Sequence, residues 1–207
     1  MIIDISPTLS PSTAVFPGDV SFERHVAMDM KRGDALTLSS IRSTVHIGAH
    51  VDAPNHYARE GRGIDAQALE LYYGPCEVIR VLGANGRRLT VSDIEAPPRA
   101  ERVLFATESF PDPNAWNDDF ASLSPELVDW LAGHGVRLVG IDTPSVDPAT
   151  SKQLESHTAI ARHDMAILEG VVLEDVRPGL YTLAAFPLKL AGADASPVRA
   201  VLIEPDP

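Results

Sequence analysis

The clearest pattern of hydrophobic and polar positions lies in residues 45–52, where the two kinds alternate. Apolar residues take the odd positions and polar residues or glycine the even ones: Val45, Ile47, Ala49 and Val51 against His46, Gly48, His50 and Asp52. Successive side chains of a strand point to opposite faces, so this pattern predicts a strand with one buried and one polar face. A helix is disfavoured, because Gly48 and Pro54 would interrupt it and three of the apolar residues are β-branched.

Short apolar runs elsewhere predict the other strands. We expect strands near 1–5, 20–30, 35–45, 76–82, 103–107, 136–141, 166–168, 180–186 and 198–203. The second of the two early strands, 35–45, leads into the histidine-containing stretch. The runs at 76–82, 103–107 and 136–141 are apolar almost throughout, which is typical of strands in the core of a sheet.

Helical signals are confined to fewer places. Ser124 and Pro125 are suited to the N-cap and first position of a helix that ends at Gly133 or Gly135. A second helix is expected from near Pro148 to about Arg162, and Ser92 is expected to cap a short one. Strands and helices alternate in the second half of the chain after a strand-rich first half. This order predicts an α/β fold with a mixed sheet, in a single domain spanning residues 1–207.

Composition limits the kind of partner. The 207 residues carry a formal net charge of -12, which argues against nucleic acid or an anionic membrane as a ligand. No apolar run is long enough to span a membrane, and the first residues do not resemble a signal peptide. The single cysteine, Cys76, lies in an apolar run and is expected to be a buried structural thiol. Since it cannot form an intrachain disulfide, we expect a cytoplasmic protein.

The polar face of the 45–52 stretch carries the candidate chemistry. His46, His50 and Asp52 are candidate metal ligands, although three solvent-facing side chains on an edge strand would give the same pattern. No thiolate accompanies them, so a cysteine-rich structural zinc site is not expected. Imidazole and carboxylate ligands with open positions are typical of catalytic sites and accept Zn²⁺, Mn²⁺, Co²⁺ or Cd²⁺.

Spacing sets a condition on this site. In a strand the Cα atoms of His50 and Asp52 would be roughly 6.6 Å apart, within reach of one ion, but those of His46 and His50 would be roughly 13 Å apart. Binding one ion through both His46 and His50 would strain a fully extended strand. Either the chain bends at Gly48, or Asp52 bridges two ions about 3.5–4 Å apart.

Residues outside the stretch must complete the site. His56 is either a further ligand or a general base beside the metal. His157 and His163 are six residues apart in the second helical region, so at most one of them faces the site. Glu169 ends an apolar run and is either exposed at its tip or drawn inward to a cation. Asp142 also ends a buried strand, where an Asx-type turn is the preferred interpretation.

Phe16 precedes a second notable feature, the Pro17-Gly18 turn signal. A surface turn is the ordinary interpretation of such a pair. An apolar ring directly before the turn is also suited to the wall of a pocket.

The pattern His46-x-Gly-Ala-His50-x-Asp52-x-Pro-x-His56 resembles the signature of the metal-dependent cyclase-like hydrolases. The nearest branch is similar to the bacterial kynurenine formamidases (arylformamidases). Supporting stretches are 4–7, 16–19, 73–76, 140–145, 165–170 and 194–201, so the likeness spans nearly the whole chain.

The resemblance implies a swivelling β/α fold and a site with two zinc ions per subunit. His46, His50 and Asp52 would bind one ion, and His50 or Asp52 would reach the second, with His157 completing it and Glu169 bridging. His56 would be the acid and base. Phe16 would contact the aromatic substrate at a position where the family often has Trp. A homodimer is also implied.

The activity implied by this branch is metal-dependent hydrolysis of N-formyl-L-kynurenine, a small aromatic formamide, to L-kynurenine and formate in tryptophan degradation. A related amide hydrolase of the same family, such as an isatin hydrolase, is one alternative. A non-catalytic metal-binding protein is the other.

Overall fold

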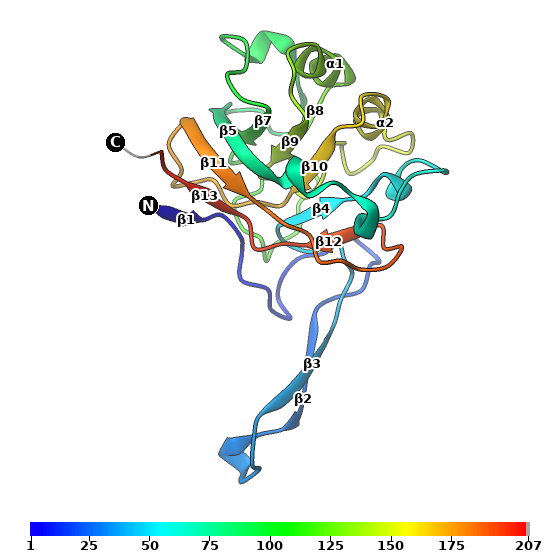
Figure 1. Cartoon of the computed structure of the whole chain (residues 1–207), viewed down its shortest axis with the longest axis vertical. Helices are drawn as coiled ribbons and strands as arrows, with labels where there is room; N and C mark the ends of the chain where they lie inside the picture. Colours follow the sequence, from blue (N-terminus) through cyan, green and yellow to red (C-terminus); the bar gives the residue numbers. More distant parts are fainter. Residues whose placement is uncertain (206–207) are drawn as a thin grey trace.

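A nine-stranded mixed sheet is the centre of the computed structural model, which describes residues 1–205 (Figure 1). Across the sheet the strands are β1 (Ile2–Asp4), β13 (Val201–Ile203), β11 (Gly179–Ala184), β5 (Tyr73–Arg80), β7 (Arg102–Ala106), β9 (Leu138–Ile141), β10 (Ala166–Glu169), β4 (His50–Asp52) and β12 (Ala195–Pro197). The four central strands, β5, β7, β9 and β10, are parallel, and the strands at either side run antiparallel. The expected α/β class with a mixed sheet is confirmed.

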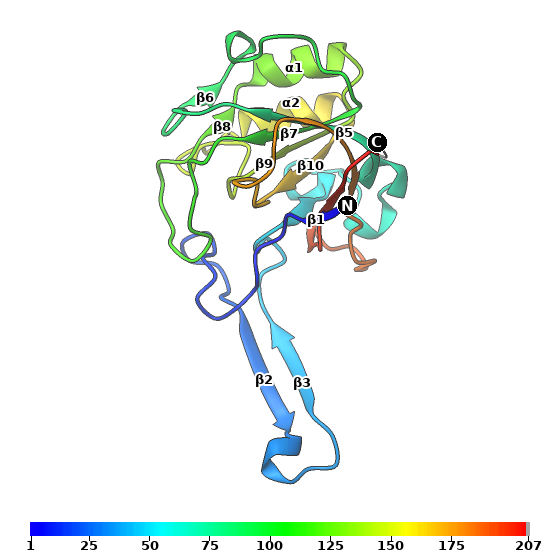
Figure 2. The same ribbon diagram turned by 90° about the vertical axis from the view of Figure 1, so that its left-hand side faces the viewer.

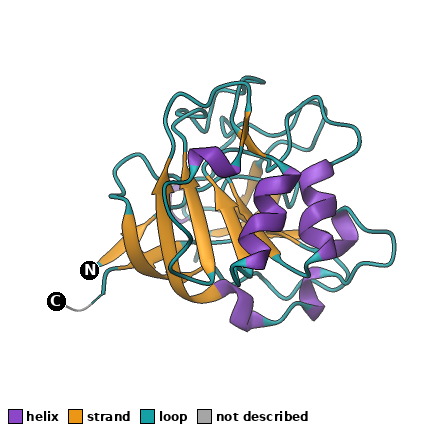
Figure 3. Ribbon diagram, turned by 90° about the horizontal axis from the view of Figure 1, so that it is seen from above, coloured by secondary structure: helices purple, strands orange, loops and turns teal. Residues whose placement is uncertain are grey.

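The sheet is curled (Figure 3), and apolar cores cover both of its faces. Strand β7 shows how the sequence produces them, because all five of its residues are buried. Val103 and Phe105 point into the core beneath the helices, whereas Leu104 and Ala106 point into the core on the other face. After Arg102 at its start, this strand therefore has four consecutive apolar residues instead of an alternating sequence, as expected for a strand buried on both faces.

Two helices, α1 (Pro125–Gly133) and α2 (Glu155–Arg162), pack together on one face (Figures 2 and 3). The expected cap of α1 is confirmed, since the Ser124 hydroxyl accepts a 3.1 Å hydrogen bond from the Leu127 amide. The expected start of α2 near Pro148 is wrong. Leu154 has φ +49°, a left-handed conformation that helical residues do not adopt, so the helix begins only at Glu155.

Smaller elements complete the body. Strands β6 (Arg88–Leu89) and β8 (Ser122–Leu123) form a short parallel pair. The 3₁₀ helices are Met30–Arg32, Pro54–His56, Ile64–Ala66, Leu69–Tyr72 and Val91–Asp93. Ser92 lies inside the last of these turns and does not cap it; Thr90 does, in a capping box with Asp93. No helix in the part of the chain described here has the length and apolar character needed to cross a membrane.

Strands β2 (Glu23–Met28) and β3 (Leu38–Arg42) form an arm that projects away from the body (Figures 1 and 2). They correspond to the two early strands predicted from sequence, but β3 ends at Arg42. The chain does not continue as one strand through the histidine-containing stretch. Pairing resumes only at His50, and the prediction of a single strand over residues 45–52 is therefore wrong.

A bend at Gly48 replaces the predicted straight strand. Gly48 has φ +54°, and a Cβ there would lie 2.6 Å from the Leu9 side chain. Its carbonyl oxygen is approached by Gly170, where a Cβ would lie only 2.2 Å away. Gly170, with φ +65°, directly follows Glu169 at the end of β10. Two glycines thus let the bend of the histidine-containing stretch lie against the end of β10.

Replacing Gly170 with alanine should lower the free energy of unfolding by about 3 kcal/mol or more, from backbone strain and overpacking together. Urea denaturation of both proteins measures the difference. Gly83→Ala is the matched control, because Gly83 has φ +70° but nothing within 4 Å of an added Cβ. It should lose only the conformational cost, about 1 kcal/mol. Equal losses in the two variants would show that the approach to Gly48 does not constrain the fold.

Candidate metal centre

Strand β4 places His50 and Asp52 inside the sheet, between β10 and β12. They are 3% and 1% exposed, so they are not the solvent-facing edge residues of the alternative interpretation. In the antiparallel register His50 lies opposite Glu169. Cross-strand partners have adjacent side chains, and Glu169 Oε2 lies 3.2 Å from His50 Nε2. Glu169 is buried, so it is directed inward and is not exposed at the tip of its strand.

Helix α2 brings His157 to the same place. Its Nε2 atom is 3.4 Å from Asp52 Oδ2 and 3.7 Å from Glu169 Oε1. His163, at the end of the helix, pairs instead with Asp129 at the surface. The expectation that at most one of these two histidines faces the site is confirmed.

His46 and His56 also lie beside Asp52. The bend at Gly48 brings His46 Nδ1 to 3.0 Å from Asp52 Oδ1, which an extended strand would not allow. His56 follows Pro54 in a 3₁₀ turn, and its ring centroid lies 4.2 Å from that of His46. The spacing of His46 and His50 left two possibilities, a bend at Gly48 or two ions bridged by Asp52. The structure has the bend at Gly48.

Two groups of potential ligands result, and they share one carboxylate. Ligand atoms of His46, Asp52 and His56 lie within 4.8 Å of one another, and so do those of His50, Asp52 and Glu169. The structure therefore brings together the six residues that the sequence singles out for metal binding and proton transfer. Asp52 lies at their centre.

Unpaired polar atoms show that these residues fit a divalent cation. Within residues 1–205, His50 Nε2 and both carboxylate oxygens of Asp52 are buried without a hydrogen-bond partner. His50 Nδ1 lies 2.9 Å from the Gly48 carbonyl and donates to it, which leaves a lone pair on Nε2. Buried unpaired acceptors are costly, and a cation bound by nitrogen and oxygen ligands would compensate all three.

The carboxylates also shift the pKa values of the histidines. Burial alone would lower the pKa of His46, but Asp52 and Asp194 outweigh it and raise the pKa to about 9. Burial acts on His157 in the same way, and Asp147 and Asp52 raise its pKa to about 10. His56 differs, because burial prevails there and lowers its pKa. The lowered pKa keeps His56 neutral at physiological pH, in contrast to His46 and His157.

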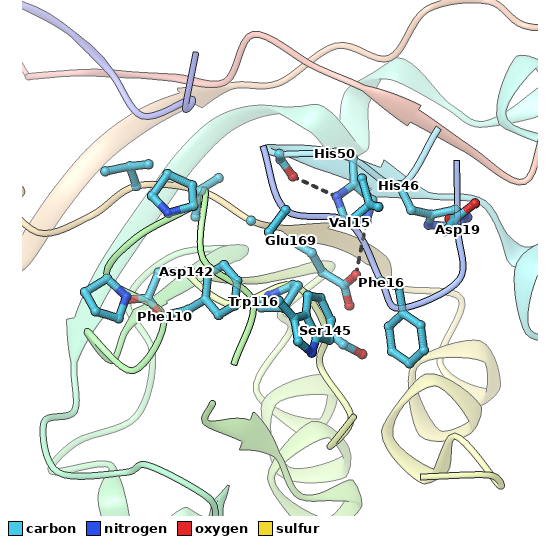
Figure 4. Close-up of a pocket in the computed structure, with 18 of the residues that line it drawn as sticks. Val15, Phe16, Asp19, His46, His50, Phe110, Trp116, Asp142, Ser145 and Glu169 are labelled. Carbon is cyan, nitrogen blue, oxygen red and sulfur yellow. Dashed lines mark hydrogen bonds and ion pairs between the residues drawn. The ribbon is translucent and has the colours of Figure 1, made fainter. Parts of the chain in front are cut away.

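A cavity of about 610 Å³ opens above these residues (Figure 4). His46, His50 and Glu169 line it on one side, and the rings of Phe16 and Trp116 line it on another. Phe16 is 46% exposed, and its ring meets that of Trp116 edge-to-face with centroids 5.2 Å apart. Phe16 thus lies in a pocket wall as well as before a turn.

Asp142 has a different role from the predicted Asx-type turn, which is wrong. Its carboxylate accepts hydrogen bonds from the amides of Thr107 and Glu108, at 2.7 and 2.8 Å, and from the Thr107 hydroxyl. It thereby joins the ends of β7 and β9 at the cavity. Burial raises the pKa of this carboxyl to about 6.

Three functional candidates were not identified from the sequence: Trp116, Asp147 and Asp194. Trp116 belongs to the segment 110–119, whose prolines and aspartates indicate only a loop. Asp194 Oδ2 lies 3.0 Å from His46 Nε2, because the next residue, Ala195, pairs with Asp52 in the sheet. A carboxylate before a three-residue strand is too weak a signal to identify such a contact.

Comparison with known proteins agrees with this geometry. A family model described as "Putative cyclase" matches residues 3–148. The chain is 46% identical over 205 residues to a kynurenine formamidase of Bordetella pertussis, covering 97% of each chain. Among solved structures it is similar to a potential metal-dependent hydrolase with cyclase activity (26% identity, TM-score 0.84, 100% and 99% of the two chains). It is also similar to isatin hydrolase A of Ralstonia solanacearum (25%, TM-score 0.81, 99% and 92%).

Zinc affinity should increase with pH, because an ion must displace the protons that His46 and His157 retain in the metal-free protein. Each displaced proton should strengthen apparent binding about tenfold per pH unit below the pKa values of about 9 and 10. Chelator competition between pH 6 and 8 measures this dependence. A flat profile would contradict the raised pKa values.

The stability of the metal-free protein should change in the opposite direction. A histidine pKa raised above 6.5 contributes stability that is complete below pH 6.5 and is lost as the pH rises through about 9 to 10. Thermal unfolding in the presence of a chelator, between pH 6.5 and 10, provides the check.

Proposed function

The chain belongs to the cyclase family, and we propose that it is a metal-dependent formamidase that hydrolyses N-formyl-L-kynurenine to L-kynurenine and formate. The substrate is inferred from the 46% identity to a kynurenine formamidase across almost all of both chains. The two clusters of His, Asp and Glu residues, with unpaired buried atoms at His50 and Asp52, support the dependence on metal.

We propose further that five residues hold two zinc ions: His46, His50, Asp52, His157 and Glu169. Asp52 belongs to both ligand groups and is the natural residue to contact both ions. Mn²⁺, Co²⁺ or Cd²⁺ would be accepted by the same nitrogen and oxygen donors. When bound, the ions would lower the pKa of a water and polarise the formyl carbonyl.

His56 is proposed to move the proton. Its lowered pKa leaves a neutral ring able to accept the proton of the water that attacks the formyl carbon. The same ring then delivers that proton to the aniline nitrogen as the C–N bond breaks and formate leaves. Asp194 Oδ2, 3.7 Å from His56 Nδ1, stabilises the protonated ring in between.

The aromatic half of the substrate is proposed to lie against Phe16 and Trp116. Phe16 and the neighbouring Trp116 contribute a phenyl and an indole ring to the same wall. The indole N–H of Trp116 is already donated to Asp118 Oδ1, at 2.8 Å. The wall therefore offers stacking surface, and the metal centre is left to recognise the formyl group.

One preparation assayed with two substrates tests the activity. N-formyl-L-kynurenine should be hydrolysed faster than isatin, and chelation should abolish the activity until zinc is restored. Faster turnover of isatin would favour the isatin hydrolase alternative, which the similarity to isatin hydrolase A keeps open. Bound zinc without hydrolysis of either substrate would favour a non-catalytic metal-binding protein.

In the same assay His56→Ala should lower kcat by about 10²- to 10⁴-fold, the usual contribution of a general acid–base group. Its zinc content should equal that of the unmodified protein. His163→Ala, a histidine paired only with surface Asp129, is the matched control and should keep full activity. Loss of one zinc ion from His56→Ala would make His56 a ligand, as its place among the His46 and Asp52 ligand atoms allows.

We also propose a homodimer formed through the β2–β3 arm. The arm leaves large apolar side chains exposed, with Met30 at 65%, Leu38 at 52% and Ile41 at 69%. An isolated two-stranded hairpin is marginally stable at best in water. A second copy of the chain that covers these side chains would stabilise the arm.

Light scattering after size exclusion should give twice the chain mass of 22.3 kDa. Ile41→Asp should shift the protein towards the monomer, because a charge would be buried in the interface. Leu82→Asp, at a 58% exposed position outside the arm, should remain dimeric. A monomeric unmodified protein would refute the proposal.

A further inference from the structure

One buried carboxylate, that of Asp147, contacts both the first turn of α2 and the ring of His157. Asp147 is 0% exposed. Its Oδ2 atom lies 2.8 Å from His157 Nδ1 and accepts from the His157 amide at 3.1 Å. Both carboxylate oxygens also accept from the Ser156 amide at 3.1 Å. The backbone and the side chain of one residue, His157, are thus held by the same group.

The start of α2 makes this carboxylate necessary. Leu154 is the N-cap residue, and it offers no side-chain acceptor and has a left-handed backbone. The first amides of the helix would therefore lack partners. Asp147 replaces the missing cap from a loop that precedes the helix, and this fixes where His157 enters the site.

Arg88 compensates the buried charge. Its Nη1 atom donates to Asp147 Oδ1 at 2.7 Å and to the Ser156 hydroxyl at 2.8 Å. The Ser156 hydroxyl in turn donates to the Leu123 carbonyl at 2.7 Å. Because Arg88 lies in β6 and Leu123 in β8, the carboxylate is anchored to a second sheet and its position does not depend on α2 alone.

We infer that Asp147 is a positioning residue that sets the tautomer and orientation of His157 for metal binding. When Nδ1 donates its proton to Asp147, the lone pair is on Nε2, the atom that lies 3.4 Å from Asp52 and 3.7 Å from Glu169. Carboxylate partners of this kind orient ligating histidines and increase their basicity. The inference rests on the proposed role of His157 as a ligand.

Asp147→Asn separates the cap from the ring contact. Asparagine caps helices as well as aspartate does, so α2 should still form. Its amide group has no charge and presents N–H donors beside Nδ1, which favours the tautomer with the proton on Nε2. The affinity for the more weakly bound zinc ion, measured by chelator competition, should fall about 10- to 100-fold.

A second measurement reports on the ring directly. In the zinc-loaded protein the His157 Nδ1 proton should give a downfield NMR resonance protected from exchange, assigned by its loss in His157→Gln. Asp147→Asn should remove that resonance. This measurement does not depend on Asp147→Asn, so an unprotected His157 Nδ1 proton would overturn the inference even if that variant failed to fold.

Ser156→Ala is the matched control, because it removes a hydroxyl from the same network and leaves the contact between Asp147 and His157 in place. Its zinc affinity should be unchanged. Unchanged affinity in Asp147→Asn, with an ion lost in His157→Ala, would make Asp147 a helix cap only and overturn the inference. Two ions retained in His157→Ala would instead refute the proposed ligand, and the inference with it.

Discussion

The structure depends on how two carboxylates are compensated inside a sheet. Asp52 and Glu169 are almost fully buried on adjacent strands, where isolated charges are very unfavourable. Burial alone would raise the pKa of Asp52, yet His157 and His46 hold it well below its usual range. Three imidazoles surround the pair, but both oxygens of Asp52 still lack aligned hydrogen bonds within residues 1–205. The compensation by the histidines is therefore electrostatic, and it leaves acceptor atoms that a cation could bind.

Strand register explains why residues far apart in the chain meet here. His50 lies opposite Glu169 on one side, and Asp52 lies opposite Ala195, the neighbour of Asp194, on the other. A slip of one residue in β4 would turn His50 and Asp52 to the opposite face of the sheet. Close approach of backbone at Gly48 and Gly170 opposes such a slip. The two glycines thus help to position His50 and Asp52, although they are not themselves candidate site residues.

Much of this arrangement was predictable from the sequence because it is local. The apolar runs of β5, β7 and β9 and the Ser124-Pro125 start of α1 lie in regular elements that their own residues favour. The alternation over residues 45–52 correctly predicted that Ile47, Ala49 and Val51 are buried. It did not predict the bend, because the alternation of polar and apolar residues gives no information about the φ angle of a single glycine.

Contacts made across the fold were not predictable in the same way. The late start of α2 depends on Leu154 in a left-handed conformation and on a cap that comes from Asp147. The Asp142 carboxylate accepts hydrogen bonds from Thr107 and Glu108, which directly follow β7, and not from a turn of its own. Likewise the aromatic wall depends on Phe16 meeting Trp116, a hundred residues later in the chain. The partners of Asp142 and Phe16 are distant in sequence, and Asp147 caps α2 from a loop outside the helix.

The histidines divide into anchored and unanchored rings, and this division supports the assignment of roles. His50 is held by the Gly48 carbonyl, His157 by Asp147 and His46 by Asp194, each through a ring nitrogen. A ligand benefits from such restraint, because a fixed ring presents its lone pair without further loss of conformational entropy. His56 has no side-chain hydrogen bond within the described residues and is 32% exposed. A ring that must accept a proton from water and deliver it to the substrate nitrogen needs that freedom, so the least restrained of these four histidines is the best suited to proton transfer.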